Sequence, residues 1–324
     1  MEPERKRLLV SVVKELSEDH RNRIRAAAEA HGFDVFIADD AETAKPYLTR
    51  AEILFSADSS LLAYTPHLKW VCTPFAGIDS FRGPGVLRDE SILLSNSSGA
   101  YGITISEHVI MMILMILRKM EDYHAYREEK RWKRDLAIRS IHGSDTVIIG
   151  TGDIGQNIAI RLRAFSPRSI LGVNQSLNNP DNLFDSVVPV SSLREILGSA
   201  DLVILALPKT EATYHMISDA ELSLMKDDAV LINVGRGTVI DETALIRHLD
   251  NHRLFAGLDV FETEPLPEES PLWHHERTLI TPHCSGNMTL KITVDIVVDQ
   301  FLEDFGRYCH GLPLRYGADV KRGY

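Results

Sequence analysis

Residues 146–165 combine a strand pattern, a glycine-rich turn and a helix pattern in immediate succession. The apolar run 146–149 leads into Gly150-Thr-Gly-Asp-Ile-Gly155, and apolar residues then recur at helical spacing. In such a unit the first glycine permits a tight turn, the second lets a pyrophosphate approach the backbone, and the third lets the helix touch the strand. Free amides at the helix start attract the anion. The pattern therefore predicts a doubly wound α/β domain that binds a dinucleotide.

Short apolar runs alternate with helical patterns along the rest of the chain, which predicts parallel sheets covered on both faces. The first series of predicted strands covers residues 8–13, 33–37, 53–55, 70–72 and 92–94. The second series covers residues 146–149, 170–173, 187–190, 202–207, 230–234, 255–260 and 279–280. Two patterns of the form Ser-x-x-Glu, at Ser192 and Ser218, are typical of capping boxes at helix starts.

The strand series restarts after residues 98–106 and ends near Gly286. We therefore expect two domains, both doubly wound parallel sheets. The dinucleotide-binding domain is expected to span residues 101–286. The other domain is expected to join residues 1–100 to the tail 287–324. Within this tail, residues 287–307 have a helical periodicity that suits packing on the first domain.

Composition excludes several other classes of protein. A formal charge of −11 does not favour binding to nucleic acid or to an anionic membrane. The longest apolar run, 109–117, is about half of the roughly 18–20 residues that a span needs, so it predicts a buried helix. Cys72, Cys284 and Cys309 form no Cys-x-x-Cys pair, which suggests neither a disulfide framework nor a zinc site. The charged start has no small-residue cleavage site, which predicts a first strand and not a signal peptide. Together these features predict a cytoplasmic protein, with no metal and no membrane or nucleic-acid partner.

The choice of coenzyme depends on the segment after the second strand of the dinucleotide domain. An acidic residue there would bind the adenosine ribose, but the chain has Asn174-Gln-Ser176. A carboxylate would repel a 2′-phosphate, whereas amide and hydroxyl groups can donate to one. No arginine follows to pair the phosphate, and Lys209 is either a second contact or a solvated surface lysine. The sequence favours NADP over NAD.

Three residues of different chemistry follow three predicted strands of the second series. They are Arg236, Glu264 and His283. Because the carboxyl ends of parallel strands face one crevice, these side chains can converge. A guanidinium matches a carboxylate, an imidazole moves a proton near neutral pH, and a carboxylate can hold that imidazole. Together they are the groups needed to reduce a 2-oxo acid.

Over nearly its whole length the chain resembles the D-isomer-specific 2-hydroxyacid dehydrogenases. The resemblance rests on the glycine loop, on residues 201–245, on Asp259-Val-Phe-Glu-Thr-Glu-Pro265 and on Thr281-Pro-His283. It implies a Rossmann-type coenzyme domain inserted in a flavodoxin-like substrate domain. It also implies a homodimer, with residues 105–132 at the contact.

The resemblance implies a role for each catalytic residue. Arg236 would grip the substrate carboxylate and polarise its carbonyl, His283 would protonate the carbonyl oxygen, and Glu264 would hydrogen-bond the imidazole. Residues 75–79 are similar to the loop whose amides receive the carboxylate, although a plain turn is an open alternative. Asp259 is either a second carboxylate near the histidine or a cap.

The remaining candidate positions complete two sets. The substrate set is Phe75, Ala76, Gly77, Asn96 and Arg236. The coenzyme set is Gly150, Gly152, Asp153, Ile154, Gly155, Asn174, Gln175, Ser176, Leu207, Pro208, Thr213, Val234, Gly235, Asp259 and Gly286.

The expected activity is NAD(P)-dependent interconversion of a small 2-oxo acid and its D-2-hydroxy acid. A phosphoglycerate-specific or glyoxylate/hydroxypyruvate-specific member is an open alternative, although 324 residues leave no room for the extra regulatory domain of some phosphoglycerate enzymes. A second alternative is a coenzyme-sensing binding protein of the corepressor kind, since some such relatives keep the same three residues. The chain has no long disordered or basic extension that would favour it.

Overall fold

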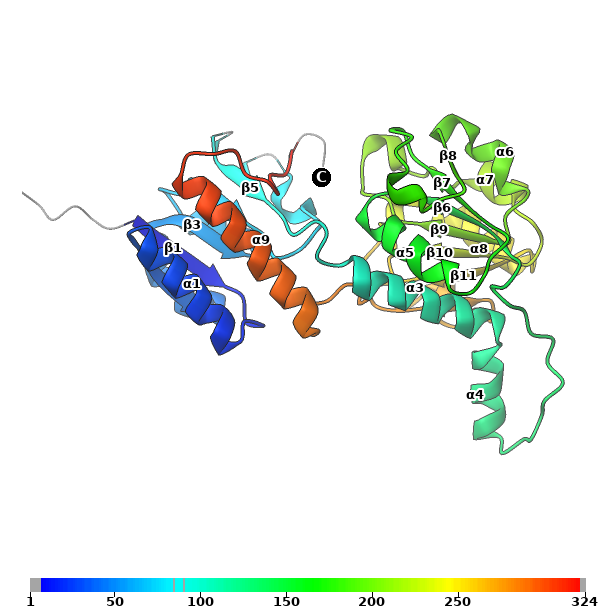
Figure 1. Cartoon of the computed structure of the whole chain (residues 1–324). Helices are drawn as coiled ribbons and strands as arrows, with labels where there is room; N and C mark the ends of the chain where they lie inside the picture. Colours follow the sequence, from blue (N-terminus) through cyan, green and yellow to red (C-terminus); the bar gives the residue numbers. More distant parts are fainter. Residues whose placement is uncertain (1–6, 84, 90, 321–324) are drawn as a thin grey trace, which may run out of the picture. The chain divides into compact units, whose positions relative to one another are not determined.

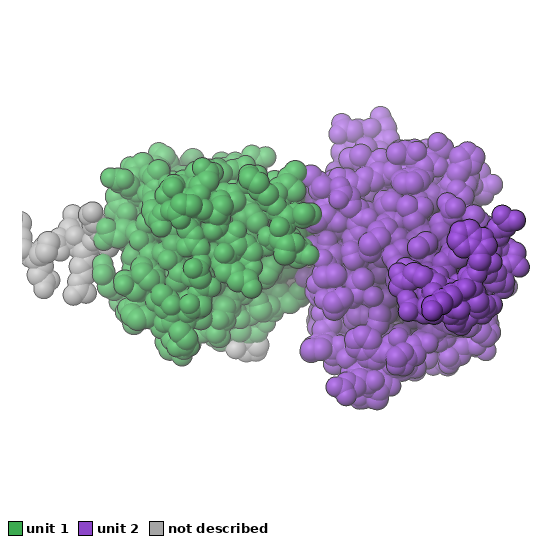
Figure 2. All heavy atoms as spheres, turned by 90° about the horizontal axis from the view of Figure 1, so that it is seen from below, with its two compact units in different colours: residues 1–101, 287–324 green, residues 102–286 purple. Residues whose placement is uncertain are grey.

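The computed structural model describes residues 7–83, 85–89 and 91–320. The chain divides into two compact units, coloured separately in Figure 2. Unit 1 is Met1–Tyr101 with Asn287–Tyr324, and unit 2 is Gly102–Gly286. Each unit is built on its own parallel sheet (Figure 1).

Unit 1 contains a five-stranded sheet in the order β2-β1-β3-β4-β5, with every pair parallel. Its strands are β1 (Arg7–Val12), β2 (Phe33–Ala38), β3 (Ala51–Ser56), β4 (Trp70–Cys72) and β5 (Leu93–Ser95). Its helices are α1 (Glu18–Ala30), α2 (Ala41–Leu48), η1 (Ser59–Tyr64), η2 (Asp79–Phe81) and α9 (Lys291–Cys309). This strand order is that of flavodoxin-like folds, so the predicted fold class is confirmed for this unit.

Helix α9 brings the C-terminal part of the chain back to the first sheet. It lies beside α1 (Figure 1). Its residue Phe301 stacks on Phe55 of β3 at a ring-centroid distance of 4.3 Å and on Trp70 of β4 at 5.5 Å. All three rings are fully buried, so aromatic packing holds this helix on the sheet.

Unit 2 contains a seven-stranded parallel sheet in the order β12-β11-β10-β9-β6-β7-β8. Its strands are β6 (Asp145–Ile149), β7 (Ser169–Val173), β8 (Ser186–Val188), β9 (Leu202–Leu205), β10 (Ala229–Asn233), β11 (Leu254–Leu258) and β12 (Thr278–Ile280). Its α-helices are α3 (Gly102–Leu117), α4 (Met120–Glu128), α5 (Asp153–Arg163), α6 (Leu193–Leu197), α7 (Asp219–Leu224) and α8 (Glu242–Asp250). Its 3-10 turns are η3 (Pro180–Asn182), η4 (Val190–Ser192), η5 (Glu211–Thr213), η6 (Gly237–Val239) and η7 (Pro271–Trp273).

The sheet of unit 2 is covered on both faces, as the apolar strands predict. Helices α6, α7 and α8 share one buried core with it, and α3 and α5 contact β10, β11 and β6. The strand order reverses between β6 and β9, which is where ligands bind in open parallel sheets. The predicted Rossmann-type arrangement is confirmed.

One of the two predicted capping boxes is wrong. Ser192 makes no capping hydrogen bond, because the turn η4 runs directly into α6 and gives Ser192 φ −90° and ψ 3° in place of the extended backbone of a cap. Ser218 is confirmed: its backbone N–H and its hydroxyl donate to Glu221 at 3.1 and 2.6 Å.

Helix α3 contains the apolar run that predicts a buried helix. It is buried on the side formed by Val109, Met112 and Ile113, but Met111 on another side is 41% exposed. The predicted burial is therefore confirmed for one side of the helix only. Within residues 7–83, 85–89 and 91–320, no helix is long and apolar enough to cross a membrane.

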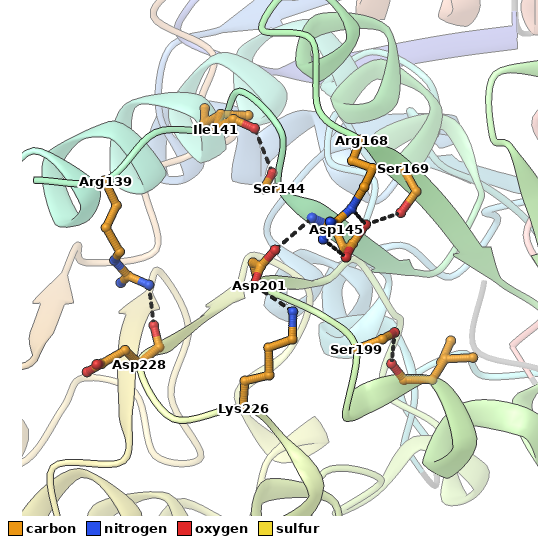
Figure 3. A network of polar contacts seen from close by, with 11 residues as sticks. Arg139, Ile141, Ser144, Asp145, Arg168, Ser169, Ser199, Asp201, Lys226 and Asp228 are labelled. Atoms are coloured by element: carbon orange, nitrogen blue, oxygen red, sulfur yellow. Dashed lines mark hydrogen bonds and ion pairs between the residues drawn. The ribbon is translucent and has the colours of Figure 1, made fainter.

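A polar network joins the amino-terminal ends of the strands in unit 2 (Figure 3). Asp201, which precedes β9, accepts the backbone N–H of Asp145 at 2.8 Å and the ammonium of Lys226 at 2.7 Å. Asp145 pairs with Arg168 and accepts the Ser169 hydroxyl at 2.8 Å. These carboxylates tie β6, β7 and β9 together at the end opposite the carboxyl ends.

Replacing Asp145 with asparagine should weaken this network in a pH-dependent way. The Arg168 guanidinium beside Asp145 lowers the pKa of that carboxyl. The folded pKa is thus below the unfolded value of about 3.9, so the pairing stabilises the fold above that pH and its contribution is lost as pH falls through the folded value. We expect Asp145→Asn to cost about 1 kcal/mol at pH 7, because the pair is partly solvated. Urea unfolding at pH 7 and pH 3.5 should show the difference shrinking at the lower pH; an equal difference at both would contradict the assignment.

Candidate active site

The three glycines of the loop after β6 have different structural roles. Gly150 has φ +100°, and a Cβ atom there would lie 2.4 Å from the carbonyl oxygen of Ala206. A Cβ atom at Gly155 would lie 2.0 Å from the carbonyl oxygen of Gly150, so only glycine lets α5 approach the turn. Nothing lies within 4 Å of a Cβ at Gly152. The loop therefore leaves open space beside its middle glycine, as a pyrophosphate needs.

The first turn of α5 is built to receive an anion. Gly152 is the cap residue of α5, and no side chain caps that turn. The Asp153 carboxylate is directed elsewhere: it accepts the Asn157 side-chain amide at 3.1 Å and the backbone N–H of Gly102. Burial raises the pKa of this carboxyl. Asp153 thus ties α5 to the start of α3, while Ile154 and Gly155 continue the open turn.

Asn174 directly follows β7 and is held by its neighbours. Its Nδ2 donates to the Thr151 hydroxyl at 2.8 Å and to the Ser176 hydroxyl at 3.2 Å, and its Oδ1 accepts the Gln175 backbone N–H at 2.8 Å. Because Nδ2 has two protons, both are used within the protein. The Ser176 hydroxyl acts as an acceptor here, so its own proton can be donated to a ligand.

The loop after β9 packs between two of the glycine turns. A Cβ atom at Gly235 would lie 2.5 Å from the carbonyl oxygen of Leu207, and the Leu207 side chain would lie 3.2 Å from a Cβ at Gly150. Thr213 donates its hydroxyl to the carbonyl of Pro208 at 2.7 Å and thereby braces this loop. The predicted coenzyme residues Leu207, Pro208 and Gly235 are therefore adjacent. The backbone N–H of Val234 donates to the Leu205 carbonyl at 3.2 Å, which joins Val234 to β9.

A buried amide holds the turn that carries Arg236. Asn233, fully buried at the end of β10, donates to the Arg236 carbonyl at 3.0 Å and accepts the Gly235 backbone N–H at 3.1 Å. A Cβ at Gly237 would lie 1.8 Å from the carbonyl carbon of Phe261. The half-buried guanidinium donates to the Gly235 carbonyl at 2.8 Å. Sequence reasoning missed Asn233, although a polar residue ending an apolar strand was the available signal.

Glu264 and His283 form the central contact of the site. The Glu264 Oε2 atom lies 2.7 Å from His283 Nδ1, and Oε1 accepts the Phe261 backbone N–H at 3.0 Å. The carboxylate is thus anchored to its own loop and fixes the imidazole through Nδ1. His283 adopts φ +49°, and its side chain is 46% exposed. Its Nε2 is therefore the nitrogen left for proton exchange with a ligand.

Asp259 holds the backbone around His283. It is fully buried and accepts the Thr281 hydroxyl at 2.6 Å and the backbone N–H groups of Cys284 and Ser285 at 2.9 and 3.0 Å. Its own carbonyl accepts the His283 N–H at 2.8 Å. Of the two sequence interpretations, these contacts match those of a cap for the segment after β12. Gly286 ends that segment and unit 2.

The register of the sheet brings the three strand ends together. Asn233 pairs with Leu258, and Leu258 pairs with Ile280, so β10, β11 and β12 end side by side. Glu264 and His283 are in direct contact, and Arg236 follows the neighbouring strand end. Lys209 is an exposed lysine on the loop after β9.

The predicted substrate loop lies in unit 1. Phe75 is 43% exposed, and its carbonyl accepts the Ser97 backbone N–H at 3.0 Å. Asn96 is 4% exposed and donates its side-chain amide to the Ala76 carbonyl at 2.6 Å. Its buried amide therefore fixes the loop that carries Ala76 and Gly77.

The chain is similar to known proteins of one family. Residues 110–285 match the family model for the D-isomer specific 2-hydroxyacid dehydrogenase, NAD binding domain. Glyoxylate/hydroxypyruvate reductase B of Enterobacter sp. (strain 638) is 32% identical over 75% of this chain and 77% of its own length. The corresponding reductase of Serratia proteamaculans is 28% identical over 85% of this chain and 86% of its own.

Solved structures show the same likeness over almost the entire chain. A D-isomer specific 2-hydroxyacid dehydrogenase family protein of Aeromonas salmonicida is 31% identical, with a TM-score of 0.86 over 97% of this chain and 99% of that one. An NADPH-dependent glyoxylate/hydroxypyruvate reductase of Sinorhizobium meliloti, in complex with NADP and sulfate, is 26% identical. Its TM-score is 0.81, over 98% of this chain and 100% of its own.

Proposed function

The chain belongs to the D-isomer-specific 2-hydroxyacid dehydrogenase family, and we propose that it reduces a small 2-oxo acid of the glyoxylate or hydroxypyruvate kind with NADPH. The observation that carries the proposal is the 2.7 Å contact between Glu264 and His283, on the same sheet as the glycine loop. An imidazole fixed at one nitrogen and exposed at the other is suited to deliver a proton.

Each side chain has one task in the proposed reaction. When bound, the coenzyme would supply a hydride to the carbonyl carbon. Arg236 binds the carboxylate with a planar fork of donors, which orients the carbonyl and stabilises the charge that develops on its oxygen. His283 donates the Nε2 proton to that oxygen and becomes neutral, and the Glu264 carboxylate stabilises the charged imidazole before the transfer. Exposure of the His283 side chain allows reprotonation from water.

The substrate class is supported by named relatives and tested by a rate assay. Glyoxylate, hydroxypyruvate, pyruvate and a branched-chain 2-oxo acid should each be offered with NADPH while its absorbance is followed. We expect oxidation with glyoxylate or hydroxypyruvate at the highest kcat/KM. A preference for phosphohydroxypyruvate would favour the phosphoglycerate alternative, and oxidation with none of the acids would overturn the proposal.

The preference for NADPH is supported by Asn174 and Ser176. Because residue 174 is an asparagine, no carboxylate at the end of β7 repels a 2′-phosphate. The Ser176 hydroxyl can donate a hydrogen bond to that phosphate. The Sinorhizobium meliloti reductase is described as NADPH-dependent. NAD and NADP both suit the glycine loop, so this choice depends on the two side chains.

Asn174→Asp should therefore change the coenzyme preference. The new carboxylate would repel the 2′-phosphate and attract the ribose hydroxyls of NADH. We expect kcat/KM for NADPH to fall about tenfold because of this repulsion, while that for NADH rises or stays level. Initial rates with both coenzymes measure the ratio. Equal losses with the two would mean that Asn174 only supports the loop.

We also propose a homodimer formed through α3 and α4. The exposed side of α3 carries Met111, and α4 has no buried residue and projects from its unit (Figure 1). Trp132, just beyond α4, is 96% exposed. An apolar helix face with an adjacent exposed tryptophan is typical of an interface.

A charge on that helix face should prevent association. Met111→Glu would have to bury an unpaired carboxylate at the proposed contact, which is unfavourable by several kcal/mol in an apolar setting. Sedimentation should give the mass of two chains for the wild type and of one chain for the variant. Leu224→Glu, at an exposed position of α7 outside the proposed contact, offers a control with the same new charge. Dimers in Met111→Glu would exclude this face.

A further inference from the structure

Helix α3 presents a histidine to the carboxyl end of β11. A Cβ atom at Gly257 would lie 3.3 Å from the Met112 side chain and 3.4 Å from that of Ile116, so the glycine lets α3 pack closely on this strand. His108 lies one turn before Met112 on the same face of the helix. Its side chain is only 14% exposed. His108 is not among the residues to which substrate binding or proton transfer is assigned.

The His108 ring is connected to the catalytic segment by one hydroxyl. Its Nε2 lies 3.0 Å from Thr281 Oγ1, and the same hydroxyl lies 2.6 Å from Asp259 Oδ1. The direct distance from His108 Nε2 to Asp259 Oδ1 is 3.9 Å, too long for a hydrogen bond. The imidazole therefore reaches the carboxylate through Thr281.

The direction of these hydrogen bonds follows from the number of protons. A carboxylate only accepts, so the single hydroxyl proton of Thr281 must point to Asp259. Thr281 Oγ1 is then an acceptor toward His108, whose Nε2 must carry a proton. Burial lowers the pKa of His108, which favours the neutral ring at neutral pH. With the opposite tautomer, the hydroxyl would turn to His108 and leave the buried carboxylate with one donor fewer.

We propose that His108 is a positioning residue for His283, acting as a neutral donor that directs the Thr281 hydroxyl onto Asp259. Asp259 in turn accepts the N–H groups of Cys284 and Ser285, and its carbonyl accepts that of His283. The chain of contacts thus fixes the backbone on both sides of the proton donor. The expected effect on kcat rests on the proposed function, whereas the tautomer of His108 follows from the structure alone.

The tautomer can be tested without any activity. In the ¹⁵N-labelled full chain at neutral pH, long-range ¹H–¹⁵N spectra distinguish a protonated Nε2 from a protonated Nδ1, and His108→Gln identifies the signal. We expect a neutral ring protonated at Nε2. A ring protonated at Nδ1 alone, or at both nitrogens, would overturn the proposal, even if the protein reduced no 2-oxo acid.

The kinetic consequence is tested with a double-mutant cycle. His108→Leu and Thr281→Val each remove one link, and each should lower kcat about ten- to a hundredfold, the effect of a small displacement of a catalytic group. KM for the 2-oxo acid should change much less, because Arg236 is untouched. The double variant should be no slower than the slower single variant, since both substitutions break the same chain.

Two further variants separate positioning from simple packing. His108→Gln retains an N–H donor and should restore most of the lost kcat, while Met112→Leu, one turn further on the same face, should leave kcat at the wild-type value. The role would be refuted by additive losses in the double variant or by a change confined to KM. It would also be refuted if His108→Gln did not restore activity although its thermal unfolding showed a folded protein.

Discussion

Arg236→Lys should lower kcat/KM for the 2-oxo acid about a hundredfold, while the Kd for the coenzyme stays near its wild-type value. Lysine keeps the positive charge but replaces a planar fork by a point charge, so at least one of two parallel hydrogen bonds to the carboxylate is lost. Hydrogen bonds to charged groups contribute about 1.5–3 kcal/mol each, and about 1.4 kcal/mol corresponds to a factor of ten. The backbone frame set by Asn233 does not depend on the side chain at 236, so folding should be unaffected.

The test is a comparison of initial rates and coenzyme titrations. Arg247→Lys provides the matched control, because Arg247 is an exposed arginine of α8 that pairs with Asp219. That control should leave kcat/KM unchanged. If Arg236→Lys turned over the acid at the wild-type rate, the guanidinium would have no part in binding the carboxylate.

Much of the architecture could be predicted because it depends on local patterns. Alternating apolar runs and helical patterns fix the order of strands, and the glycine loop identifies the strand at the centre of the second sheet. The strand after residue 201 nevertheless ends at Leu205 and not at Leu207. Beyond the strand, the backbone of Leu207 packs against Gly235, a contact between loops far apart in the sequence that no local pattern predicts.

The sequence predicts which side chains follow the strand ends, but not which residues hold the loops that carry them. Arg236, Glu264 and His283 each follow a strand, so their grouping follows from a parallel sheet. Asn233 and Asp259 bind backbone atoms of loops, and the conformation of these loops cannot be predicted from a sequence pattern. Ser192 was misassigned for the same reason, since a 3-10 turn before α6 cannot be distinguished from a cap by residue type. Where a residue acts by touching the main chain, its role depends on three-dimensional structure.

His283→Asn is the second substitution with a large expected effect. An amide is a much weaker acid than an imidazolium and cannot donate a proton to the substrate, so hydride transfer would leave an alkoxide without a proton source. General acid catalysis contributes about 10²- to 10⁴-fold, and kcat for reduction should fall within that range. The dependence of kcat on pH should become flat, because no titrating donor remains. A variant that kept the wild-type rate and profile would assign proton donation to another group.

Glu264→Gln distinguishes the proton donor from the carboxylate that holds it. Glutamine can still contact His283 Nδ1, which lies 2.7 Å from the carboxylate in the wild type, but it removes the negative charge that favours the protonated ring. Without that charge, the alkaline limb of the reduction profile should move to lower pH while kcat on the acid side is largely kept. In the direction of hydroxy-acid oxidation, which needs the neutral ring, the same variant should become active at lower pH. The opposite shifts in rate follow only if Glu264 acts through the charge on His283, and an unmoved limb in both directions would show that the 2.7 Å contact serves the loop and not the chemistry.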